Sequence, residues 1–186
     1  MAISRTQRGA NTRERIIESA QALIFKQGFA GTSIDDIITD VGVTKGGFFH
    51  HFKNKADLGR AVLENYASWD YALFSGFEQR ADEASDDPLE STLIFIKSFE
   101  DFIAEQPQTP PGCLFACYLY AEDNFDDDVR ALIAKFFQFW ERMYERRFSA
   151  ILEQYSPRQS ITALELSEML MSIIEGSLVL AKCQDD

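Results

Sequence analysis

The stretch from residue 28 to residue 55 constrains the fold of this chain more than any other. It reads as two short helical segments, Ile34–Val41 and Lys45–Phe52, joined by Gly42. Isoleucine and valine at helical spacing give the first segment one buried face. Gly42 permits a sharp turn between the two segments. Two short helices joined by a glycine-centred turn predict a helix-turn-helix, the geometry that sets a second helix into the major groove of a duplex.

Both short segments carry cap signals at their starts. Ser33, followed three residues later by Asp36, predicts a capping box, and Thr44 is placed to cap the second segment. That second segment is unusual because Gly46 and Gly47 together cost about 2 kcal/mol relative to alanine in a helix. Bare backbone there lets the positive helix end and its N–H groups approach phosphates closely. A plain helical hairpin with a polar face is the alternative interpretation.

The rest of the chain predicts an all-α fold, because no strand-like alternation occurs in it. Gly28 ends the first helix, Asn54 caps the fourth, and Pro107, Pro110 and Pro111 form a break. Outside the two short segments, the expected helices cover about residues 12–27, 55–80, 89–105, 113–121, 126–155 and 160–182.

Three parts are expected along the chain. Residues 1–11 form a flexible basic tail, residues 12–54 a DNA-binding head with the helix-turn-helix, and residues 55–186 a larger body. Arg5 and Arg8 allow the tail to act as an arm in the minor groove, with a disordered tail as the alternative.

Charge is divided unequally between the two ends of the chain. The net charge is −12, but residues 1–60 carry nine Lys/Arg and six Asp/Glu, a net charge of +3. The remaining residues carry nine Lys/Arg and 24 Asp/Glu, a net charge of −15. Phosphate repels the acidic part, so only the basic end is suited to approach a nucleic acid.

Several classes of protein are excluded by what the sequence lacks. No apolar run of about 18 residues predicts a membrane span, and residues 1–10 do not have the pattern of a signal peptide. Cys113, Cys117 and Cys183 are too few for a disulfide scaffold, which favours a reducing cytoplasm. No nucleophile–base pair, carboxylate dyad or phosphate loop indicates an enzyme, and no cofactor is expected. The adjacent His50 and His51 diverge on a helix, so no metal site is predicted either.

The helix-turn-helix region resembles the N-terminal domain of the TetR/AcrR family. That family has a capped helix, Gly-Val, and then Ser/Thr-x-Gly-x-Leu-Tyr-x-His-Phe-x-x-Lys-x-x-Leu. The match extends over about residues 12–60. Phe49 departs from it, because tyrosine is usual there and phenylalanine lacks the hydroxyl that would bind a phosphate. The matching positions are Thr44, Gly46, Phe48, Phe49, His51, Phe52, Lys55 and Leu58.

The resemblance implies which residues contact double-stranded operator DNA. Thr32 and Ser33 would touch the DNA backbone, and Lys55 would anchor on phosphate. The groove-facing and phosphate-facing residues of the second short helix would be Thr44, Lys45, Gly46, Gly47, Phe49, His50 and His51. For each residue the alternative role is a cap, a turn or a solvated surface.

The resemblance also implies that the body forms a homodimer through its last two long helices and binds a small effector. The final helix is apolar on more than one side, in agreement with such an interface. The aromatic content indicates a flat or lipophilic effector, and the acidity a neutral or cationic one. Candidate pocket residues are Tyr66, Phe99, Phe102, Cys113, Phe115, Cys117, Phe137 and Trp140.

The expected function is that of a repressor that a lipophilic effector releases from a pseudo-palindromic operator. The main alternative is a sensor repressor switched by an oxidant or electrophile at Cys113, since a thiol near a helix N-terminus is activated. Two small buried side chains at Cys113 and Cys117 are the structural alternative. An adaptor that has lost DNA binding is a further possibility.

Overall fold

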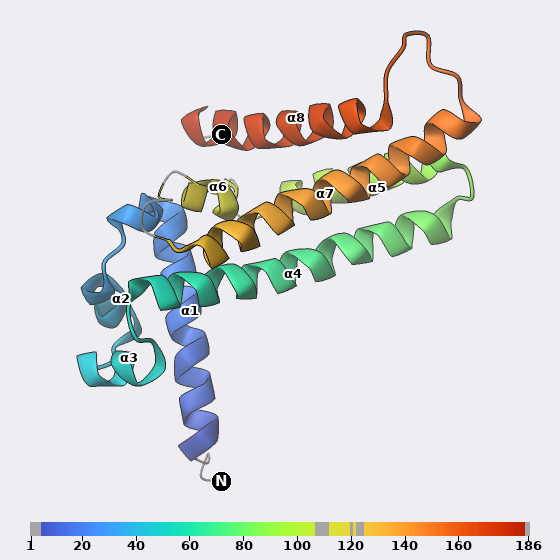
Figure 1. Cartoon of the computed structure of the whole chain (residues 1–186). Helices are drawn as coiled ribbons and strands as arrows, with labels where there is room; N and C mark the ends of the chain where they lie inside the picture. Colours follow the sequence, from blue (N-terminus) through green and yellow to red (C-terminus); the bar gives the residue numbers. More distant parts are fainter. Residues whose placement is uncertain (1–4, 107–111, 120, 122–124, 185–186) are drawn as a thin grey trace. The chain divides into compact units, whose positions relative to one another are not determined.

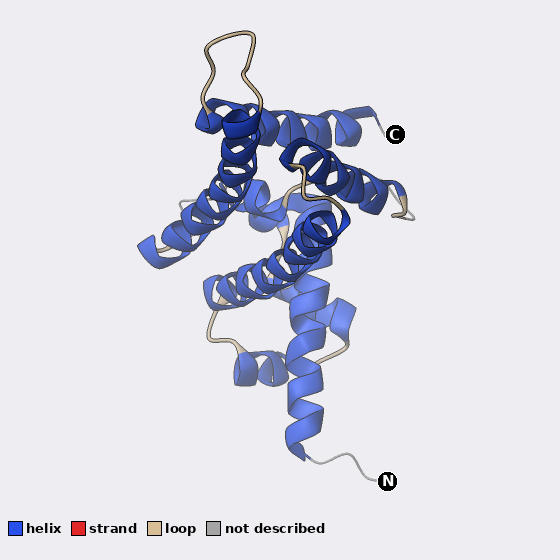
Figure 2. Ribbon diagram, turned by 90° about the vertical axis from the view of Figure 1, so that its right-hand side faces the viewer, coloured by secondary structure: helices blue, strands red, loops and turns tan. Residues whose placement is uncertain are grey.

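The computed structural model describes residues 5–106, 112–119, 121 and 125–184. Its described residues form helices and connecting loops without a strand, which confirms the all-α prediction (Figure 2). None of these helices is long and apolar enough to cross a membrane. The helices are α1 (Arg5–Gly31), α2 (Ile34–Val41), α3 (Lys45–His51), α4 (Lys55–Ala84), α5 (Pro88–Ala104), α6 (Leu114–Leu119), α7 (Asp127–Gln154) and α8 (Ala163–Gln184).

Most helix bounds lie within a few residues of those predicted, and α1 is the main exception. It begins at Arg5 rather than near Thr12, although the side chains of Arg5 and Arg8 lie outside the described part of the chain. Gly28 has φ +76° and a non-helical backbone, so the first long helix stops there as predicted, and a short helical turn over residues 29–31 follows under the same label. The predicted proline break at residues 107, 110 and 111 also lies outside the described residues.

Side-chain caps fix the starts of the helices that matter for the site. Ser33 and Asp36 form the predicted capping box on α2, and the Thr44 hydroxyl accepts the Gly47 N–H at 3.1 Å on α3. The Asn54 side chain accepts the Asp57 N–H at 2.8 Å at the start of α4. Such caps each stabilise a helix by about 1 kcal/mol. They confirm the sequence interpretation of these turns.

The chain divides into two compact units. The N-terminal unit comprises residues 1–68 and 114–131, and the C-terminal unit comprises residues 69–113 and 132–186. The division therefore falls inside α4 and inside α7.

The N-terminal unit is built around α1, with α2 and α3 beside it (Figure 1). Phe29 joins this group to α6 and the segment before α7, because its ring lies 5.0 Å from Tyr118 and 4.4 Å from Phe125. The Tyr118 hydroxyl donates to the Gly59 carbonyl of α4 at 3.1 Å. The buried apolar residues contributed by α1 to α4 include Ile16, Ile17, Ala20, Ile24, Ile37, Val41, Phe48, Leu58, Val62 and Leu63.

The C-terminal unit has an aromatic core contributed by four helices. Its centre comprises Phe74, Phe77 and Ala81 of α4, Phe95 of α5, and Met143 and Tyr144 of α7, with Leu170, Met171 and Ile174 of α8 against it. A buried cation, Arg147, lies 3.1 Å from the Asp82 carboxylate and 4.6 Å above the Phe95 ring. Hydrogen bonds and ion pairs of this kind offset the cost of burying the charge.

Gly59 and Gly76, both on α4, provide a matched test of the N-terminal packing. A Cβ at Gly59 would lie 2.7 Å from Phe29 Cε2, whereas a Cβ at Gly76 would meet only the end of the Arg80 side chain at 3.7 Å. Gly59→Ala is expected to lower the free energy of unfolding by about 1–3 kcal/mol through overpacking. Gly76→Ala is expected to raise it by about 0.5–1 kcal/mol. Urea denaturation measures both, and equal stability of the two variants would contradict this packing.

Candidate functional site

The start of α3 is an exposed helix N-terminus with no acidic residue in its first turn. Gly46 lies in open space, because a Cβ built there would meet no atom within 4 Å. A Cβ at Gly47 would instead lie 3.3 Å from the Thr44 hydroxyl oxygen that caps the helix. The sequence interpretation assigned both glycines to close backbone approach. The structure provides a packing reason for Gly47 and none for Gly46.

Lys45 is the exposed cation nearest this helix start. Its ammonium lies 3.6 Å from the Asp35 carboxylate of α2, with both side chains largely in solvent. An exposed ion pair of this kind contributes about 0–1 kcal/mol to the stability of the fold. Lys45 can therefore leave Asp35 and bind another anion at little cost in free energy. The start of α2 differs from that of α3, since Asp35 and Asp36 occupy its first turn. Of the two helix starts, that of α3 is therefore the better suited to an anion.

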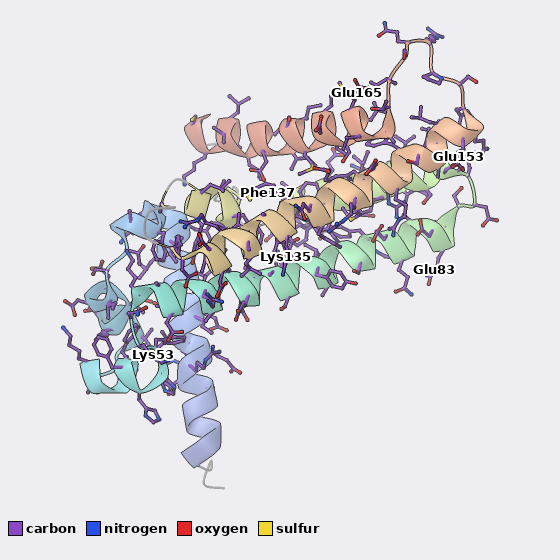
Figure 3. The ribbon with its side chains drawn as sticks, viewed as in Figure 1. Lys53, Glu83, Lys135, Phe137, Glu153 and Glu165 are labelled. Carbon is purple, nitrogen blue, oxygen red and sulfur yellow. The ribbon has the colours of Figure 1, made fainter. Side chains whose placement is uncertain are left out.

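A group of basic side chains continues the surface past Lys45. His50 is exposed and His51 half-buried, and burial, together with the positive charges of His50 and Arg13, lowers the pKa of His51. The Arg13 guanidinium lies 5.2 Å above the ring of Phe52. Lys53 is exposed in the turn before α4, as Figure 3 shows. Sequence reasoning missed Arg13 and Lys53. The only sequence signal that Lys53 belongs to the DNA-binding surface was the basic charge of residues 45–55. No sequence signal placed Arg13 of α1 on that surface.

Two of the predicted DNA contacts are engaged within the fold. Thr32 is 1% exposed, and its hydroxyl donates to the Gly28 carbonyl at 2.8 Å. We therefore leave Thr32 out of the candidate surface, since its hydroxyl secures the end of α1. Ser33 is exposed, but its hydroxyl and N–H both serve the capping box with Asp36.

Of the next two predicted DNA contacts, Lys55 is engaged within the fold and Phe49 is exposed. The Lys55 ammonium donates to the Ala30 carbonyl at 3.3 Å and lies 4.4 Å above the Phe29 ring. Burial lowers the pKa of Lys55. This side chain links the start of α4 to the end of α1. Phe49 is 44% exposed and projects from α3.

The predicted pocket residues fall in both units. In the N-terminal unit, Phe115 is fully buried, Tyr66 packs on it with ring centroids 5.4 Å apart, and Cys117 is half-buried. Tyr66 also contacts Phe25 at 5.9 Å. These three predicted residues therefore belong to the packing of the same unit as α1.

The other predicted pocket residues lie in the C-terminal unit, where the aromatic ones surround Phe74 and Trp140. Phe99 lies 5.4 Å from Phe74, and Phe74 lies 6.1 Å from Trp140. Phe137, labelled in Figure 3, meets the same indole edge-on at 5.8 Å. Phe102 lies 6.1 Å from Trp69. The structure thus brings together most of the predicted aromatic lining of this unit.

Two acidic residues that sequence reasoning missed lie in this unit. The Trp140 indole donates to the Asp70 carboxylate at 2.9 Å, and burial raises the pKa of Asp70 to about 7. Burial also raises the pKa of Glu175 on α8, which accepts a hydrogen bond from the Cys113 thiol. Nothing in the local pattern indicated that Asp70 is buried and Glu175 half-buried. Among the described residues, no group of His, Cys, Asp or Glu is arranged to hold a metal ion.

These features define a class of protein. An all-α chain with a capped helix-turn-helix and a basic, exposed α3 start is a DNA-binding transcriptional regulator. Residues 16–62 match the model of the bacterial regulatory proteins of the tetR family. The N-terminal region of the chain is therefore that of a TetR-family transcriptional regulator.

Relatives of similar length support this assignment. The chain is 28% identical over 180 residues to an uncharacterized HTH-type transcriptional regulator in the lacX 3'region of Lactococcus lactis, covering 95% of this chain and 86% of that protein. It is 22% identical over 172 residues to the HTH-type transcriptional repressor DhaR of a Mycobacterium species, covering 92% and 83%. A TetR-family regulator from Agrobacterium tumefaciens has the same fold, with a TM-score of 0.81, 23% identity and coverage of 96% and 90%.

Proposed function

We propose that this regulator is a cytoplasmic homodimeric repressor that leaves a pseudo-palindromic operator when a small effector binds. Residues 12–54 act as the DNA-binding head and residues 55–186 as the ligand-binding and dimerisation body. The observation that carries the proposal is the exposed start of α3, where open backbone at Gly46 adjoins Lys45. Repression is supported by relatives such as DhaR, which is named a repressor.

The proposed DNA contacts differ in kind along the surface. Thr44, Lys45 and Gly46 face the major groove, because they form the start of the recognition helix. Phe49 offers an apolar surface there, and Gly47 preserves the cap. His50 and His51 reach phosphates. We add Arg13, whose guanidinium lies over the Phe52 ring at the end of α3, and Lys53, which follows Phe52 and is exposed. Ser33 and Lys55 support the site by holding the turn and α4 in place.

The outer side of α8 is the proposed dimer interface, where a second copy of the chain binds. The inner side of α8 packs on the core, and Ser167 there is fully buried, with its hydroxyl donating to the Glu141 carbonyl at 2.8 Å. Large apolar side chains are nevertheless exposed along the same helix, and a helix that is apolar on several sides needs a second partner. These exposed residues are Leu164, Met169, Ile173, Val179 and Leu180.

Effector control requires that the ligand bind more tightly to the form that does not hold DNA. The aromatic group around Phe74 and Trp140 is the proposed ligand site, and α4 runs from this unit into the N-terminal unit. In the N-terminal unit, the Arg60 guanidinium of α4 lies 3.2 Å from the Asp126 carboxylate and 3.3 Å from that of Asp128. A shift of α4 on ligand binding would therefore alter the packing of the N-terminal unit, which holds α3.

The thiol-switched alternative receives no support from the surroundings of Cys113. This residue is 7% exposed and its thiol donates to the Glu175 carboxylate. Reactive cysteines are accessible and have cationic neighbours, whereas this neighbour is an acid. A reversible small-molecule effector is the function that we retain.

Removing the Lys45 ammonium tests the DNA-binding surface. With an operator selected from random duplexes by the wild-type protein, Lys45→Ala is expected to weaken binding about 10–100-fold, since a base or phosphate contact of this kind contributes about 1–3 kcal/mol. Lys97→Ala removes the same charge from α5, where Lys97 pairs with Glu100 and Asp101. That control is expected to bind like wild type. Wild-type affinity of Lys45→Ala in a gel shift would refute the proposed surface.

Placing a charge on the outer side of α8 tests the dimer. Ile173 is 61% exposed and Leu93 on α5 is 58% exposed, so glutamate fits either position without disturbing the core. Ile173→Glu is expected to shift the protein to monomers in sedimentation equilibrium, because burying an unpaired carboxylate in an interface is costly. Leu93→Glu is expected to leave the dimer intact. A dimer of unchanged affinity in Ile173→Glu would exclude this face.

A further inference from the structure

We propose that the effector is an organic cation with an aromatic or lipophilic body, held by the carboxylate of Asp70 among the rings of the C-terminal unit. This inference rests on the proposed function. It narrows the chemical class of the effector, which the sequence allowed to be either neutral or cationic, to cations. It depends on one buried carboxylate that has no counter-ion among the described residues, and on the aromatic rings that pack against Trp140, the residue that donates a hydrogen bond to that carboxylate.

Asp70 is an acid in an apolar surrounding. The residue is 3% exposed, and the hydrogen bond from the Trp140 indole to Oδ2 is its one described polar contact. The other carboxylate oxygen, Oδ1, accepts no hydrogen bond from the described residues. No Lys, Arg or His nitrogen of that part of the chain lies within 4 Å of it. A buried carboxylate without a cation costs stability, and such groups are enriched at ligand sites.

Glu78, two turns further along α4, shows how the same unit neutralises a structural acid. Arg146 pairs directly with the Glu78 carboxylate, and Arg147 lies 3.7 Å from it. No arginine or lysine of the described residues pairs with Asp70 in this way. Glu175 on α8 adds a second acid without a counter-ion, since its described side-chain contact is the thiol of Cys113.

The charges of all three acids act on Tyr144 of α7. Burial raises the pKa of Tyr144, and the negative charges of Asp70, Glu175 and Glu78 raise it further. Among the described residues neither Asp70 nor Glu175 has a cationic partner, so ionisation of either acid leaves an unpaired negative charge there. A cation entering the surroundings of Tyr144 gains attraction from both acids in a medium of low dielectric constant.

Aromatic rings provide the second half of a cation site. Trp140 donates its N–H to Asp70 and packs against Phe74 at 6.1 Å, Phe136 at 6.4 Å and Phe137 at 5.8 Å. Aromatic faces attract organic cations, most strongly when water is excluded. A carboxylate beside such rings favours a cation with an apolar body, because the body is buried against the rings. A small hydrated cation would instead have to lose its hydration shell without that gain.

Fluorescence titration of the purified dimer tests the proposal directly. The chain has two tryptophans, Trp69 and Trp140, both in the C-terminal unit. The probes are the cations benzyltrimethylammonium and tetraphenylphosphonium, neutral triphenylphosphine oxide and anionic tetraphenylborate. The variants are Asp70→Asn, which keeps an oxygen for the Trp140 N–H, and Glu153→Gln. Glu153 is an exposed acid at the far end of α7 (Figure 3), so its variant removes the same charge elsewhere.

At pH 8 the wild type is expected to bind at least one cation tenfold or more tightly than the neutral and anionic probes. Asp70→Asn is expected to lose at least tenfold in cation affinity, and Glu153→Gln none. Because the pKa of Asp70 is about 7, lowering the pH from 8 to 6 is expected to weaken cation binding to the wild type about tenfold through proton competition. That dependence should vanish in Asp70→Asn.

The proposal is overturned if neither cation binds the wild type more tightly than the uncharged probe, or if Asp70→Asn binds cations like wild type. A second experiment adds the bound cation to the complex of the protein with its operator and measures operator affinity. It distinguishes failure of the cation site from failure of the proposed effector control. Cation binding that depends on Asp70 but leaves operator affinity unchanged would support the cation site and refute effector control. Operator release by the neutral probe in both wild type and Asp70→Asn would support effector control and refute the cation site.

Discussion

The cap of Thr44 on the Gly47 N–H, at 3.1 Å, is the interaction on which the site depends. It fixes the residue at which α3 begins, immediately after the left-handed turn at Gly42, where φ is +72°. Because the helix begins there, Lys45 and Gly46 form its exposed first turn. The remaining N–H groups of that turn point outward without an acidic neighbour on the same helix. The proposed mode of DNA recognition therefore depends on where one short helix starts.

The unit that holds α3 is larger than the helix-turn-helix. Lys55 joins α4 to the end of α1, and the close approach of Gly59 to Phe29 leaves no room for a side chain. Residues 114–131 belong to the same unit, through the contacts of Tyr118 and Phe125 with Phe29. The recognition helix is thus supported by residues far from it in sequence. The ionic contacts of Arg60 with Asp126 and Asp128 are part of this support.

Local chemistry made much of this fold predictable. The bounds of α2, its capping box and the Thr44 cap follow from side chains within a few residues of one another, and the sequence indicated all of them. The inward turn of Lys55 and the burial of Asp70 beside Trp140 depend on contacts between distant segments. A single sequence contains no signal for those contacts. The packing role of Gly47 was missed for another reason. Helix propensity treats Gly46 and Gly47 alike, but only Gly47 lies against the Thr44 hydroxyl that caps the helix.

The most direct test of the proposed DNA surface concerns Gly46. We attribute the glycine at this position to close approach of DNA, because the packing of the protein does not require it. In Gly46→Ala, unfolding by urea and operator affinity are measured on the same sample, with Gly76→Ala as the matched glycine in the C-terminal unit. The added methyl group has open space around it. It is therefore predicted to raise the free energy of unfolding by about 0.5–1 kcal/mol, while operator affinity falls tenfold or more. Unchanged operator affinity in the stabilised variant would contradict the assignment of the α3 start to DNA.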